Sequence, residues 1–166
     1  MIVLNAGYAD TNKFHKLPED SMDKIIETNL LTNMRITHAL LPKAIVNGTK
    51  FVFVSSILAR IPLHNCASYC VSKSALSQFY SSLVLEYPHL PLLCVEIGGV
   101  KTNFHEKANI KVNKRHLKSE TVIGNRLYDA IVHKTGVTTL STDWKILRKL
   151  CMVFEDSAIT VMKRIS

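Results

Sequence analysis

The stretch that most constrains the fold runs from Phe51 to Lys73, FVFVSSILARIPLHNCASYCVSK. It opens with four uncharged β-branched and aromatic residues, a pattern typical of a strand buried on both faces of a parallel sheet. The strand is expected to end at Ser55 and Ser56, and a loop leads from there to a helix that begins near Ala67. The segment therefore predicts an α/β fold built on a parallel sheet.

Two side chains of the predicted helix suggest chemistry. Tyr69 and Lys73 are four residues apart, so they share one helix face, one turn apart. An ammonium beside a phenol lowers the tyrosine pKa from its usual ~10, and such a tyrosine can exchange protons near neutral pH. Ser56 ends a strand, at the rim where open α/β sheets bind ligands. Taken singly, such a spacing is usually a surface pair and a Ser-Ser pair is usually a turn, so only the combination is specific.

This combination resembles the active-site segment of the short-chain dehydrogenases/reductases. In that family a serine ends the fifth strand, and a Tyr-x-x-x-Lys pair opens the next helix. The gap of 13 residues between Ser56 and Tyr69 (69 − 56) fits the usual spacing of the family. The resemblance implies that Tyr69 is the general acid/base, that Lys73 lowers its pKa and binds the nicotinamide ribose, and that Ser56 hydrogen-bonds the substrate oxygen.

Two further motifs resemble the cofactor-facing segments of the family. An apolar run over residues 1–4 predicts a parallel strand that stops at a tight turn, and a second apolar run over 92–97 ends at a glycine pair. Ile97 stands in the second motif where the family usually has proline. The resemblance implies that NAD or NADP is bound by Asn5, Ala6, Gly7, Gly98, Val100 and Thr102, together with Tyr69 and Lys73.

A long amphipathic helix is predicted from Pro18 to about Val46, with Asn29 on or near its apolar face. A buried asparagine in a helix is costly unless it is paired, and taken alone it fits a structural role as well as a functional one. The family places an asparagine here, where it holds a water that relays protons to the lysine. The resemblance therefore adds Asn29 to the three catalytic residues above.

Composition limits the partners. The net charge is +8, but lysines and arginines are dispersed without interleaved aromatics, so no nucleic-acid partner is predicted. The four cysteines form no CxxC pair and no metal spacing with histidines, which predicts no metal site and a reducing, cytoplasmic location. No apolar run reaches the length of a membrane span. The resemblance implies a small-molecule carbonyl or alcohol substrate, and a homo-oligomer of the kind that the two long helices often build in the family.

The rest of the chain is less specific. Residues 103–118 are polar and basic and are interpreted as a solvated loop and helix face, 119–133 as a helix capped by Ser119, and 136–140 as a weak strand. The segment 142–166 is basic and amphipathic. It could pack on a partner subunit, cover the substrate pocket, or make peripheral contact with a membrane surface.

The chain is interpreted as one incomplete Rossmann-like domain over 1–166. Dinucleotide folds use a glycine-rich turn after the first strand, and none of the six glycines here forms one. The resemblance begins at the fourth strand of the family, so a partial doubly wound sheet from strand 4 onward is expected. Two functions stay open: an NAD(P)-dependent carbonyl/alcohol oxidoreductase, or a catalytically silent truncated domain that acts as an interaction piece or has no role.

Overall fold

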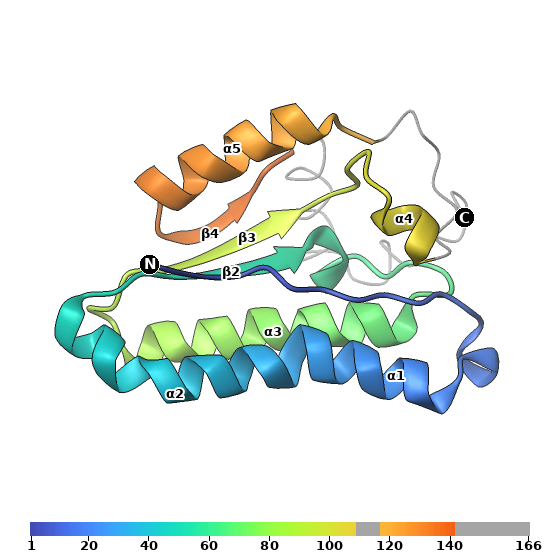
Figure 1. The fold of residues 1–166 in the computed structure, drawn as a ribbon, viewed down its shortest axis with the longest axis horizontal. Coiled ribbons are helices and arrows are strands. Elements are labelled where there is room, and N and C mark those ends of the chain that lie inside the picture. The colour runs from blue at the N-terminus through green and yellow to red at the C-terminus, as the bar shows by residue number, and fades with distance from the viewer. Residues whose placement is uncertain (109–116, 142–166) are drawn as a thin grey trace.

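A computed structural model of the chain describes residues 1–108 and 117–141. Four strands form a single parallel sheet in the order β1-β2-β3-β4. Their bounds are β1 Ile2–Leu4, β2 Phe51–Ser56, β3 Leu92–Ile97 and β4 Gly136–Thr139. Helices cover both faces of this sheet, with α2 and α3 on one side and α5 on the other (Figure 1). The predicted α/β fold with a doubly wound parallel sheet is confirmed.

The connections are helical, as parallel strands require. Between β1 and β2 lie η1 (Phe14–Lys16), α1 (Glu19–Ile26), η2 (Glu27–Leu31) and α2 (Thr32–Asn47). The crossover from β2 to β3 contains η3 (Ile57–Ala59) and α3 (Ala67–Glu86), and that from β3 to β4 contains α4 (Phe104–Lys107) and α5 (Glu120–His133). The segment 142–166, for which we predict a separate basic amphipathic element, lies outside the described residues.

The long helix predicted before β2 is continuous but not regular. Its central part, η2, is a π-helical turn between α1 and α2, which the apolar periodicity of the sequence does not show. Pro42 lies inside α2 without ending it. The helix ends where expected, because Gly48 takes the left-handed conformation (φ 60°) that caps a helix with least strain in glycine.

Two apolar layers hold the sheet between the helices. Phe51 and Phe53 of β2 pack with Leu76 of α3 on one side of the sheet. Val52, between them in sequence, packs with Ile123 of α5 on the other side. All six residues of β2 are buried, which explains why this strand reads as a continuous apolar run.

The arrangement brings the segments that follow β1, β2 and β3 to one edge of the sheet. In a parallel sheet all carboxyl ends point the same way, so the turn at 5–7, the η3 turn and the segment 98–102 adjoin one another. This edge is where the predicted site residues lie. In the described residues no helix is both long and apolar enough to pass through a bilayer.

Candidate active site

Ser56 and Tyr69 meet at the carboxyl end of β2. Ser56 is the last residue of the strand, and Tyr69 lies in the first turn of α3. Both residues are buried, and their side chains lie close enough for the Ser56 hydroxyl to lower the pKa of Tyr69. The strand holds the serine rigidly, and the crossover brings α3 back over it. The fold therefore brings the Ser56 and Tyr69 side chains close together at the carboxyl end of β2.

Lys73 lies one turn further along α3 and is almost fully buried, with 3% of its surface exposed. Its Nζ donates a hydrogen bond to the carbonyl of Val54 at 3.0 Å and lies 5.9 Å from the centroid of the Tyr69 ring. Burial disfavours the charged form and lowers the pKa of Lys73 to about 8. At neutral pH the lysine therefore still carries its charge, although it does so at a cost.

The predicted lowering of the Tyr69 pKa is wrong. Burial raises the pKa of Tyr69 to about 12, and the hydrogen bond with Ser56 offsets only part of that rise. The reason is geometric, because the ammonium of Lys73 donates to the Val54 carbonyl and has no hydrogen bond with the Tyr69 hydroxyl among the described residues. Tyr69 is therefore a neutral phenol at physiological pH, in the protonation state of a general acid.

Asn29 is fully buried in the π-helical turn η2 and joins three parts of the site. Its Oδ1 accepts from the Tyr8 backbone N–H at 2.8 Å, and its Nδ2 donates to the Tyr8 carbonyl at 2.8 Å. Nδ2 also donates to the Ser72 hydroxyl at 3.0 Å, and that hydroxyl donates to the Tyr69 carbonyl at 2.8 Å. Asn29 thus ties the turn after β1 to the start of α3, which is a structural role that its burial requires.

Gly7 lies against this group in the turn that follows β1. A Cβ atom added there would lie 3.7 Å from both Asn29 Oδ1 and Lys73 Nζ, so the residue leaves open the space that faces the ammonium. Only one of the three Nζ–H groups of Lys73 has a hydrogen-bond partner among the described residues. A cationic donor with N–H groups left for a ligand, beside a glycine turn, is a suitable cradle for the hydroxyl-rich and anionic parts of a dinucleotide.

The segment 98–102 follows β3 at the same edge and is held in place by its backbone. Lys118 N–H donates to the Gly99 carbonyl at 3.1 Å, and Lys101 N–H donates to the Lys118 carbonyl at 2.9 Å. Thr102 is exposed, and its Oγ1 accepts from the Phe104 N–H at 3.2 Å. The predicted cofactor residues Gly98, Val100 and Thr102 therefore line the rim, while the sites on 5–7 approach from β1.

Four apolar residues around Tyr69 were not predicted. Ala9 and Ala108 are buried against it, and Leu58 and Phe104 pack on this cluster. The Phe104 ring centroid lies 6.2 Å from that of Tyr69. They come from three separate segments, so no local pattern in the sequence could have joined them. Two signals were present: Leu58 lies two residues after Ser56, and Phe104 lies two residues after Thr102.

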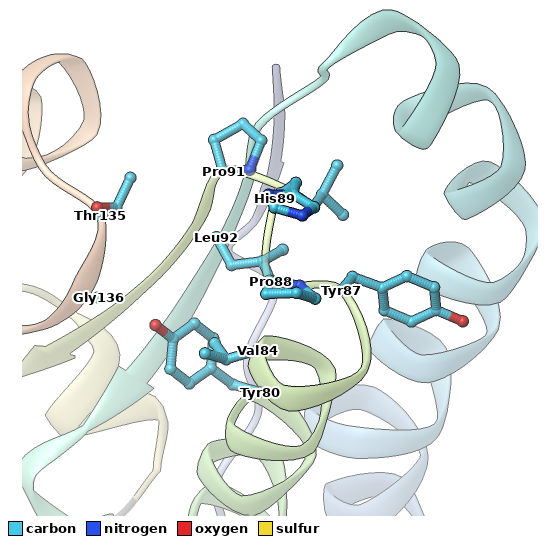
Figure 2. A pocket seen from close by; sticks show the side chains of 10 residues that line it. Tyr80, Val84, Tyr87, Pro88, His89, Pro91, Leu92, Thr135 and Gly136 are labelled. Atoms are coloured by element: carbon cyan, nitrogen blue, oxygen red, sulfur yellow. The ribbon is translucent and has the colours of Figure 1, made fainter.

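A surface pocket lies at the other end of the sheet (Figure 2). Tyr80 and Tyr87 at the end of α3 line it, with Leu92 at the start of β3 and Gly136 at the start of β4. Strands β3 and β4 begin at this pocket and end at the rim where the predicted catalytic side chains gather. The pocket contains none of the predicted site residues and is not the candidate active site.

Two other features bear on the chemistry. Cys66, Cys70 and Cys94 are free thiols, and burial raises the pKa of each. Within residues 1–108 and 117–141 no group of three histidine, cysteine or acidic side chains could hold a metal ion.

The curated proteins to which this chain is similar in sequence are dehydrogenases and reductases. The chain is 34% identical over 91 residues to dehydrogenase/reductase SDR family member 4 of Bos taurus, which covers 53% of this chain and 33% of that protein. It is 27% identical over 174 residues to estradiol 17-beta-dehydrogenase 11 of Homo sapiens, which covers 99% of this chain and 56% of that protein. The chain thus spans between a third and a little more than half of the length of these relatives.

Solved structures share the fold. A short chain dehydrogenase from Burkholderia cenocepacia, described in complex with NADP, superposes with a TM-score of 0.84 at 17% identity, over 98% of this chain and 68% of that one. At this identity the likeness establishes the fold alone. The family model for short chain dehydrogenases matches residues 1–113, about two thirds of the sequence. The chain therefore belongs to the short-chain dehydrogenase family.

Proposed function

We propose that this chain carries the catalytic site of an NAD(P)-dependent oxidoreductase that interconverts a carbonyl and an alcohol. The observation that carries the proposal is the convergence of Ser56, Tyr69 and Lys73 at the carboxyl edge of the sheet, with Gly7 open above the lysine. Membership of the short-chain dehydrogenase family supports it. So do the names of the curated relatives, which are dehydrogenases and reductases.

Tyr69 is the proposed general acid/base. Its raised pKa keeps the phenol protonated, so in the direction of carbonyl reduction it can give its proton to the substrate oxygen. Ser56 is proposed to hydrogen-bond the same oxygen and to stabilise the charge that develops on it. The interaction of the Ser56 hydroxyl with Tyr69 supports a substrate oxygen that both groups reach.

A nicotinamide cofactor, when bound, supplies the hydride. We propose that Asn5, Ala6 and Gly7 hold it from the β1 side, and that Gly98, Val100 and Thr102 hold it from the β3 side. Lys73 is proposed to donate from Nζ to the ribose hydroxyls, through the space that Gly7 leaves open. Asn29 is proposed to hold the turn after β1 against the start of α3 through its hydrogen bonds to Tyr8 and Ser72. The family resemblance implies a water-relay role for Asn29 in addition.

The substrate is proposed to be apolar next to its reactive oxygen. Leu58, Phe104, Ala9 and Ala108 surround the Tyr69 ring with apolar atoms. Such a wall favours an aliphatic or aromatic carbonyl compound over a sugar or an acid, because it offers no partners for additional polar groups. The name of one relative, estradiol 17-beta-dehydrogenase 11, is consistent with this class.

Replacement of Tyr69 by phenylalanine tests the catalytic role. The Tyr69→Phe variant is expected to lose at least ~100-fold in turnover, the scale of general acid catalysis, while its affinity for NADPH changes little. Tyr80→Phe is the matched control, because Tyr80 is also buried on α3 but packs in the core away from the rim. Near-normal turnover in Tyr69→Phe would refute the assignment.

The second candidate is a catalytically silent domain. The observation behind it is that none of the six glycines among these 166 residues forms a glycine-rich pyrophosphate turn. Isothermal titration of the purified chain with NADPH separates the two candidates, since micromolar binding excludes the silent domain. The cytoplasmic location, the homo-oligomer and the peripheral membrane contact stay predictions.

A further inference from the structure

A buried carboxylate lies beneath the candidate site and has no part in the chemistry proposed above. Glu96, near the end of β3, has no exposed surface. Its Oε2 accepts from the Thr139 hydroxyl of β4 at 2.9 Å, and its Oε1 lies 3.5 Å from Nε of Arg60. An apolar side chain could fill the same space without the cost of removing a charge from water. Stability alone therefore does not explain an acid at this position.

Arg60 links this carboxylate to the catalytic serine. Arg60 is the C-cap residue of the η3 turn, and Ser56 is its N-cap residue. The Ser56 Oγ accepts from the Leu58 N–H at 3.1 Å, so the orientation of η3 and that of the serine hydroxyl are coupled. On the other side of η3, the Ser74 hydroxyl of α3 donates to the Ala59 carbonyl at 2.7 Å. The turn is thus anchored to β3 through Arg60 and to α3 through Ser74.

We propose that Glu96 is a positioning residue, which holds η3 through Arg60 and so directs the Ser56 hydroxyl at the Tyr69 phenol. The inference rests on the proposed function in that Ser56 and Tyr69 are taken as the reacting pair. Glu96 itself touches neither the substrate nor the cofactor. Its side chain connects β4, β3 and η3, so a change there is transmitted to the serine through a chain of contacts.

The test measures the ionisation of the phenol at position 69 rather than the turnover of a substrate. A fluorinated tyrosine placed at position 69 titrates at lower pH than tyrosine, and its ionisation can be followed by fluorine NMR in the purified protein. Ser56→Ala is expected to lower the acid dissociation constant of this group by about tenfold to a hundredfold, the range of a hydrogen bond to a charged group. Glu96→Gln, which keeps the volume and can still accept from Thr139, is expected to act in the same direction by at least ~3-fold, since misdirecting the serine loses part of that hydrogen bond.

The direction of the effect separates positioning from simple electrostatics. Removing a negative charge near a phenol favours the phenolate and would raise the dissociation constant, whereas losing the Ser56 hydrogen bond lowers it. In the Ser56→Ala background, Glu96→Gln is expected to cause no further fall, because the hydrogen bond that it disturbs is already absent. Cys66, Cys70 and Lys73, the other ionisable groups beside Tyr69, are the same in every variant.

Arg60→Met tests the same link at a partly exposed position, should Glu96→Gln fail to fold. Because losing a positive charge also lowers the dissociation constant, only the comparison in the Ser56→Ala background separates positioning from electrostatics for this variant. It is expected to lower the dissociation constant in the parent and to leave it unchanged in the Ser56→Ala background. Arg126→Met is the matched control, because Arg126 bonds the Leu140 carbonyl just beyond β4 at 2.8 Å without touching η3. It is expected to have no effect.

The outcomes distinguish the two levels of the proposal. If Ser56→Ala leaves the ionisation of residue 69 unchanged, the reacting pair itself is wrong, and the proposed function falls with it. If Ser56→Ala has the expected effect but Glu96→Gln raises the dissociation constant, or adds its full effect on top of Ser56→Ala, positioning is refuted and the proposed function stands.

Discussion

Replacing Lys73 by methionine is expected to stabilise the protein near neutral pH, although it removes a residue of the candidate site. Burial lowers the lysine pKa from its ordinary 10.5 to about 8, which corresponds to about 3 kcal/mol of unfavourable charge burial. Methionine has a similar length and no charge, but it loses the hydrogen bond to the Val54 carbonyl, worth ~1 kcal/mol. The net gain is about 2 kcal/mol, or roughly 4–8 °C in Tm for a domain of this size.

The pH dependence of this gain has a defined sign. The folded protein binds the Lys73 proton less tightly than the unfolded chain, so the penalty is complete below pH ~8 and fades as pH rises toward 10.5. The free energy of unfolding of the parent should therefore rise relative to that of Lys73→Met across this window. Near pH 10.5 the advantage of the variant should be gone, and the lost hydrogen bond should leave it slightly less stable. Ionisation of Tyr69 occurs in both proteins and largely cancels in the difference.

Urea unfolding at pH 7, 9 and 10.5, followed by circular dichroism, measures this difference directly. Lys43→Met is the matched control, because Lys43 is exposed on α2 and its replacement should change stability by less than ~0.5 kcal/mol. A Lys73→Met variant that is less stable than the parent at pH 7 would refute the reasoning. So would a stability difference that does not change between pH 8 and 10.5.

Two other substitutions test the groups around the lysine. Gly7→Ala should leave the NADPH affinity within about threefold of that of the parent, because the added Cβ would make only ordinary contacts at 3.7 Å. Gly7→Val should weaken NADPH binding at least ~10-fold, because its side chain would fill the space that faces Lys73. Isothermal titration measures both affinities. Asn29→Ala should lower the free energy of unfolding by roughly 2–4 kcal/mol, since the Tyr8 N–H and carbonyl and the Ser72 hydroxyl lose a buried partner. A loss below ~1 kcal/mol in urea unfolding would show that water replaces the amide at these groups.

The local patterns of the sequence were sufficient to predict the four strands and the long helices in their order along the chain. The uncharged run that opens at Phe51 predicted the fully buried strand β2, because a strand with helices on both sides has no polar face. Ser119 caps α5 with its hydroxyl, which accepts from the Val122 N–H at 3.3 Å, and Gly48 ends α2. Tyr69 and Lys73 were placed on one helix face by their spacing alone, and the structure has them there.

What the sequence left open depends on contacts between distant segments. The π-helical turn that turns Asn29 inward leaves no trace in the apolar periodicity, and its three hydrogen bonds reach residues 21 and 43 positions away. The same holds for Glu96, whose charge would have placed it on a surface by residue type alone. Its partners Arg60 and Thr139 are 36 and 43 residues distant.

The protonation state of Tyr69 shows most clearly which properties local sequence patterns predict and which depend on tertiary packing. By itself, the sequence placed Tyr69 and Lys73 on one helix face and Ser56 at the end of a strand, because the periods of helices and strands are local properties. That the three groups meet at one edge of the sheet was implied by the family resemblance. Only the tertiary structure decided that burial outweighs the influence of Lys73, so that the phenol holds its proton. The cost of burying a charge depends on every atom packed around it, and those atoms come from parts of the chain that no local pattern connects.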